Sequence, residues 1–246
     1  MYKIAYQTLK KNIALFGFYV VFTIVVEQFV EINSSMSFVL GAMIALFSHR
    51  MILLDENYGA GDLFKKQGPS GQKPPMLSFF LVSGIGMVVF LMLLAAFFYL
   101  LFVQLSGIDL GDKEQITGAL VISTMPAVLA YGILLSLFGT VFPAAAVAGD
   151  KSPKAALRRG KASFWKTLGR LAIGPFSVGM VGFAGIVMLS NNLITSGVDI
   201  NSAMVDVPLS VLAYSLNLGT ILLGVTALSM AYQSAENQIE RGDTIK

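Results

Sequence analysis

Cysteine is absent from this 246-residue sequence, and only one histidine is present. The lack of cysteine excludes disulfide frameworks, thiolate metal sites, iron–sulfur clusters and cysteine nucleophiles. A lone histidine cannot build a zinc or heme site of the usual kind, and no P-loop, dinucleotide fingerprint or H-E-x-x-H motif occurs. We therefore expect no enzyme, no cofactor and no bound metal.

Charge is also scarce, at 13% of residues against about 25% in ordinary soluble proteins. Hydrophobic residues make up 55% of the chain, and the mean hydropathy is +0.74. Six apolar runs are long enough to cross a bilayer as helices, and none shows the alternating polarity of a barrel strand. They predict an all-α, polytopic membrane protein with one integral membrane domain over 1–246 and spans at about 12–30, 35–54, 76–105, 116–148, 168–194 and 205–232. Prolines are expected to bend the fourth and fifth spans.

Basic residues lie almost entirely on one side of this predicted topology. Every Lys and Arg except Lys113 falls in the amino-terminal arm, the second and fourth connecting segments, or the carboxyl-terminal tail. The alternate segments are acidic, and basic segments are retained in the cytoplasm. Both termini are therefore expected to be cytoplasmic, with the first span as an uncleaved anchor. The pI of about 9.0 is explained by these segments, and no nucleic-acid partner is expected.

A short amphipathic helix is predicted over about 153–166. Ser152 is suited to be its N-cap and Pro153 its first helical residue. Its spacing is typical of a helix at the cytoplasmic membrane interface, where Trp165 would lie at headgroup level. Its basic residues are candidates for binding anionic lipid headgroups or a partner protein: Lys151, Lys154, Arg158, Arg159, Lys161 and Lys166. The alternative is that they only enforce topology.

Two residues are candidates for intramembrane chemistry. Glu27 is the carboxylate most clearly inside an apolar run, and such acids suggest ion or proton coupling unless they reach the interface. His49, at the end of the second span, could relay protons or could simply occupy a helix end. A stripe of small and polar residues along the sixth span predicts close helix packing: Ala213, Asn217, Thr220, Gly224, Ala227 and Ala231.

Two segments resemble a known family. They are Tyr-Gln-Thr-Leu-Lys-Lys-Asn at 6–12 and the stretch from Phe-Pro-Ala-Ala-Ala to Trp-Lys-Thr-Leu-Gly at 142–169. This pattern resembles the six-helix membrane domain attached to some bacterial glycerophosphodiester phosphodiesterases, and its stand-alone relatives. The resemblance implies a bacterial inner-membrane protein without catalysis, because the hydrolase part of those enzymes, with its metal-binding carboxylates and histidines, is absent here.

Two functions are compatible with the sequence. One is a non-enzymatic accessory subunit or lipid-interacting component, which acts through basic cytoplasmic loops and small-residue helix faces on anionic lipids, a membrane-protein partner or a second copy. The alternative is a small transporter or permease subunit that uses Glu27 and the bent fourth and fifth helices. A transporter would be favoured by inverted repeats, and the two halves of the chain share only a vague similarity.

Overall fold

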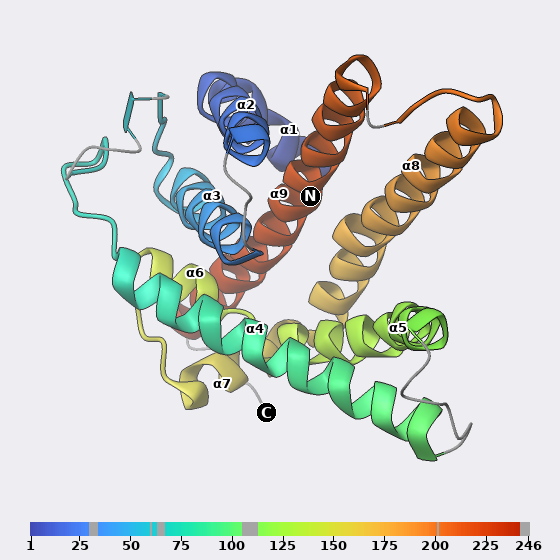
Figure 1. Cartoon of the computed structure of the whole chain (residues 1–246). Coiled ribbons are helices and arrows are strands. Elements are labelled where there is room, and N and C mark those ends of the chain that lie inside the picture. Colours follow the sequence, from blue (N-terminus) through green and yellow to red (C-terminus); the bar gives the residue numbers. More distant parts are fainter. Residues whose placement is uncertain (30–33, 60, 63–66, 105–112, 201, 242–246) are drawn as a thin grey trace.

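The computed structural model describes residues 1–29, 34–59, 61–62, 67–104, 113–200 and 202–241 (Figure 1). All regular elements within these ranges are helical. Five helices are long and apolar enough to span a membrane, or six if the bent first pair forms one span. The all-α class and the membrane character expected from the sequence are confirmed to that extent.

The chain begins with a short helix set across the others. Helix α1 (Tyr2–Lys11) meets α2 (Ile13–Phe29) at a bend of 82°. Asn12 forms the joint, and its Nδ2 donates to the Thr8 carbonyl at 3.0 Å. The Tyr2 hydroxyl donates to the Ile173 carbonyl at 2.8 Å, so the start of α1 is attached to a helix far along the sequence.

The second and third spans begin and end close to where the sequence predicts, and the sixth begins close to its predicted start but ends eight residues later than predicted. They are α3 (Ser34–Leu54), α4 (Met76–Phe98) with a π-helical extension η2 (Tyr99–Gln104), and α9 (Ala203–Glu240). Helix α3 ends at Leu54, and the next residue, Asp55, has a left-handed backbone (φ +50°). Helix α9 packs on α2, α3 and α7, and most of its buried residues lie in its carboxyl-terminal half.

The fourth span differs from its prediction, which had one helix to about residue 148. Helix α5 (Lys113–Phe138) ends ten residues earlier, and a separate helix α6 (Val141–Ala146) follows a turn. Pro143 supplies the reason, because it has no N–H to bond the carbonyl four residues earlier and would clash with it in a continuing helix. In α6 it occupies the third position, where no N–H is needed.

The amphipathic helix and the fifth span form one uninterrupted helical run, and the predicted separation near residue 167 is wrong. Helix α7 (Pro153–Leu171) passes through a π-helical turn η3 (Ala172–Phe176) into α8 (Ser177–Thr195). The predicted N-cap is confirmed, since the Ser152 hydroxyl accepts from the Ala155 N–H. Pro175 lies inside η3, where the wider turn tolerates its missing N–H.

Packing is dense at one end of the molecule and sparse elsewhere. In Figure 1, α4 and α5 lie side by side and cross the direction of α8 and α9. Helix α8 has no buried residue and α4 only Phe79, so most of their apolar surface is available to lipid. The dense end consists of the last turns of α3, the described residues 55–59 and 67–75, α6, α7 and the last turns of α9, and we call it the basic end.

Candidate functional site

Two buried arginines lie at the centre of the basic end. Arg50, near the end of α3, and Arg159, in α7, are each 1% exposed. A buried guanidinium is tolerated only when it is paired and hydrogen-bonded, because its desolvation is otherwise uncompensated. Each of the two has several partners, from segments distant in the sequence.

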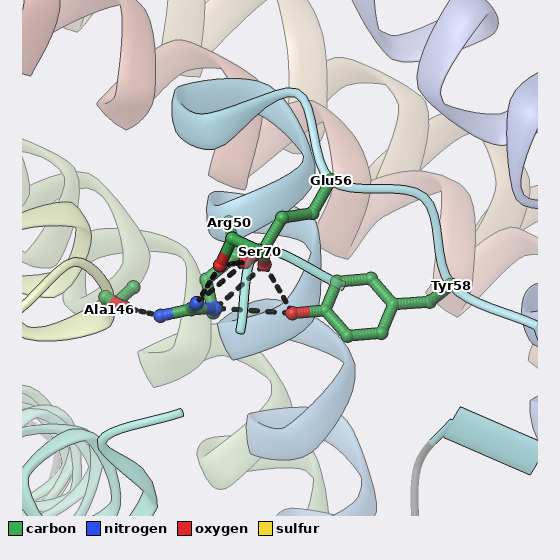
Figure 2. A network of polar contacts seen from close by, with 5 residues as sticks. All are labelled: Arg50, Glu56, Tyr58, Ser70 and Ala146. Atoms are coloured by element: carbon green, nitrogen blue, oxygen red, sulfur yellow. Dashed lines mark hydrogen bonds and ion pairs between the residues drawn. The ribbon is translucent and has the colours of Figure 1, made fainter. Parts of the chain in front are cut away.

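Arg50 forms a bidentate ion pair with Glu56 (Figure 2). Its Nη2 donates to Glu56 Oε1 at 2.7 Å and its Nε to Oε2 at 2.8 Å, while Nη1 reaches the Ala146 carbonyl at 3.1 Å. The hydroxyls of Tyr58 and Ser70 also donate to the Glu56 carboxylate. The segment after α3 is therefore folded back on the helix end.

Electrostatics keep this network in one protonation state near neutral pH. Burial by itself raises the pKa of Glu56, but the hydrogen bonds from Arg50, Ser70 and Tyr58 outweigh it and lower that pKa below its ordinary value. Burial, followed by the hydrogen bond to Glu56, raises the pKa of Tyr58. Glu56 is therefore an ionised partner of Arg50, and the cluster has the character of a structural anchor.

Acid is expected to weaken this anchor. Since the folded-state pKa of Glu56 lies below its ordinary value of 4.5, its contribution is complete above pH 4.5 and disappears as pH falls through the lower folded-state value. The melting temperature of wild type, followed by circular dichroism from pH 7 to pH 3, should fall more steeply than that of Glu56→Gln. Parallel curves would contradict the assignment.

Arg159 holds the other side of the same region. Its Nη1 donates to Glu236 Oε1 at 3.0 Å and its Nη2 to the Asp150 carbonyl at 2.6 Å. The guanidinium also lies 5.0 Å from the centre of the Tyr232 ring. Arg50 from α3 thus donates to the Ala146 carbonyl, and Arg159 from α7 donates to the Asp150 carbonyl. Both arginines therefore fix the short stretch between these two residues.

Arg159 is consequently not a surface residue, which corrects its place among the headgroup candidates. The other five are exposed. Lys154, Arg158 and Lys161 follow one another at spacings of four and three residues, and Trp165, 79% exposed, continues the same face. We call these four residues the basic stripe. The opposite face of α7 is buried and consists of small or polar residues: Ala156, Gly160, Ser163 and Thr167.

Lys151 and Lys166 lie outside this stripe. Lys151 precedes α7, and its Nζ donates to the Ser78 hydroxyl at 2.6 Å, which attaches it to the start of α4. Lys166 is exposed on the flank of α7. Neither shares the geometry of the three aligned cations.

The intramembrane candidates lie apart from the basic stripe and from each other. His49 is buried, and its Nδ1 lies 2.8 Å from the Ser229 hydroxyl of α9. Glu27 belongs to α2, but its side chain lies outside the described part of the structure. Within the described residues, no group of three or more His, Cys, Asp or Glu could hold a metal ion.

The small-residue stripe of α9 packs along only part of its length. Ala227 and Ala231 are fully buried, and Thr220 lies against Gly179 of α8. Gly224 lies opposite Pro175 in η3. Ala213 is half-buried and Asn217 is exposed, so the amino-terminal part of the stripe contributes less to helix packing.

Sequence reasoning missed Glu56, Tyr58, Ser70 and Glu236 as partners of the arginines. An acid six residues after Arg50 was a weak signal. The pairing of Arg159 with Glu236, 77 residues away, has no local signal at all. Only the crossing of α7 and α9 brings these two groups together.

No protein-family model, curated protein or solved structure matches the chain. The class of protein is therefore defined by the structure itself: over the residues that it describes, the protein is all-helical and has five or six helices able to span a membrane. The resemblance to the phosphodiesterase membrane domain stays a prediction.

Proposed function

We propose that this chain is a non-enzymatic, multi-pass protein of the bacterial cytoplasmic membrane whose basic stripe binds anionic lipid headgroups. Six spans with both termini in the cytoplasm would account for the concentration of Lys and Arg in alternate segments. The observation that carries the proposal is the alignment of Lys154, Arg158, Lys161 and Trp165 on the exposed face of α7.

The length of the fifth helical run supports a headgroup position for this face. Its 43 residues extend about 65 Å at ~1.5 Å per residue, whereas the hydrocarbon core is about 30 Å thick. The apolar α8 with η3 suffices to cross the core, so the charged α7 is left beyond it. Exposed Trp165 fits the interface, and each aligned cation contributes about 1 kcal/mol near an anionic surface.

The test compares lipid binding by purified variants in mild detergent, read by native mass spectrometry. Replacing Lys154, Arg158 and Lys161 together by Gln removes about 3 kcal/mol, so phosphatidylglycerol should bind about 100-fold more weakly. Phosphatidylcholine binding should not change. Undiminished phosphatidylglycerol binding by this triple variant would refute the proposal.

The adjacent arginines offer a matched control on one helix. Arg158 is exposed and Arg159 buried, so Arg159→Met should lower the melting temperature while the folded protein still binds phosphatidylglycerol. Arg158→Met should weaken phosphatidylglycerol binding and leave the melting temperature unchanged. The same spectra would reveal a co-purifying protein, as an accessory subunit requires, or a second copy of the chain.

The transporter alternative stays a prediction. Flux in proteoliposomes that is present in wild type and abolished in Glu27→Gln would support it.

A further inference from the structure

A polar cavity of about 120 Å³ lies at the basic end, between α1 and the end of α3. It is large enough for several water molecules, since one needs at least roughly 10–15 Å³. Its floor includes the buried side chains of Thr8, Asn12 and Met51. Lys11 and Asp55 also line it and remain largely exposed. None of the residues that line the cavity belongs to the basic stripe of α7.

Opposite charges meet at this cavity in a weak pair. Lys11 Nζ lies 3.0 Å from Asp55 Oδ1, with the two side chains 55% and 84% exposed. Such a pair contributes little because both charges stay hydrated, so a ligand that satisfies each of them can separate them. Glu56, also at the cavity, is not available in the same way because Arg50 holds its carboxylate.

The surrounding backbone favours a cation on the Asp55 side. Helix α3 ends at Leu54, next to Asp55, whereas the Thr8 and Leu9 carbonyls at the end of α1 already accept hydrogen bonds from Asn12. The last carbonyls of a helix have no partner within the helix and carry partial negative charge. Among the described residues that line the cavity, Lys11 is the one with a positive side chain. The lining thus offers one anion contact next to a negatively polarised pocket.

We propose that this cavity binds a zwitterionic ammonium–phosphate group, the headgroup chemistry of phosphatidylethanolamine. Asp55 and the end of α3 take the ammonium, and Lys11 takes the phosphate. A primary ammonium donates up to three hydrogen bonds, whereas the trimethylammonium of choline donates none. Phosphatidylethanolamine and phosphatidylcholine have the same net charge, so a preference between them isolates this contact.

Native mass spectrometry of the full chain in detergent tests the site with equal amounts of the two lipids. Loss of a charged hydrogen bond corresponds to about tenfold in affinity, so wild type should favour phosphatidylethanolamine by about tenfold. Asp55→Asn should abolish this preference. Lys11→Gln should weaken phosphatidylethanolamine binding. Lys73→Gln, an exposed lysine away from the cavity lining, should change neither.

The outcomes separate this site from the basic stripe. The triple variant of Lys154, Arg158 and Lys161 should keep the phosphatidylethanolamine preference even if it loses phosphatidylglycerol. If free phosphoethanolamine displaces bound phosphatidylethanolamine, the site can take a soluble ligand of the same chemistry. If phosphatidylethanolamine stays bound in the presence of free phosphoethanolamine, the ligand is the membrane lipid. Equal binding of the two zwitterionic lipids, or a preference that survives Asp55→Asn, would overturn the proposal.

Discussion

Glu56→Gln is expected to lower the free energy of unfolding by about 3–5 kcal/mol, because it leaves the buried Arg50 guanidinium without its counter-charge. Arg50 is 1% exposed, so water cannot replace the lost carboxylate without opening the segment after α3. The Tyr58 and Ser70 hydroxyls would lose their ionised acceptor at the same time. Chemical unfolding of the detergent-solubilised protein, followed by circular dichroism, measures the change.

The pair at the neighbouring cavity is the matched control for this prediction. Lys11 and Asp55 belong to the same region, but both are exposed, and Lys11→Gln should cost about 1 kcal/mol or less. The double variant Arg50→Met with Glu56→Met should be more stable than Arg50→Met alone, since it removes both buried charges. Equal losses for Glu56→Gln and Lys11→Gln would show that the Arg50 pair is hydrated in solution.

The positions of the spans were predictable because a run of about 20 consecutive apolar residues is typical of a membrane-spanning helix. Helices α3 and α4 begin within a residue of their predicted starts. The breaks were less predictable. Pro126 leaves α5 continuous while Pro143 lies in the first turn of a new helix. The presence of a proline in an apolar run therefore does not by itself tell where a helix ends.

The buried face of α7 could not be predicted from hydrophobicity. The sequence suggested one face that contains Pro153, Ala156, Leu157, Gly160 and Phe164. Ala156 and Gly160 are indeed buried, but Leu157 and Phe164 are only half-buried, whereas the polar Ser163 and Thr167 are buried. The hydrophobicity of a residue indicates whether it avoids water, but it does not indicate whether the residue faces lipid or another helix. Helices that pack on one another in membranes do so through small residues, and larger apolar side chains can remain on the outside.

The same limit explains the error at Arg159. A cation in a basic helix resembles its neighbours in the sequence, and nothing local distinguishes Arg158 from Arg159. Their difference comes from helix α9, whose Glu236 and Tyr232 provide a charge and a ring for one of them only. Topology, rather than composition, decides which arginine stabilises the fold and which is free to bind a ligand.

Gly160→Ala is expected to destabilise the protein by about 1–3 kcal/mol, although alanine is the better helix former. At this position α7 crosses the end of α5, and an added Cβ would approach Leu137 Cα to 2.7 Å and the Leu137 carbonyl more closely still. The obstacle is backbone, so no side-chain rotation relieves it. Helix α7 has to shift, and Arg159 moves with it away from Glu236.

Gly169 provides the control because it lies on the same helix with nothing within 4 Å of the position of an added Cβ. Gly169→Ala should gain up to about 1 kcal/mol from helix propensity alone, so the difference between the two variants isolates the α5–α7 contact. Thermal unfolding of both proteins, measured side by side in one detergent, supplies this difference. If the two substitutions shift the melting temperature equally, α7 does not cross α5 at Gly160.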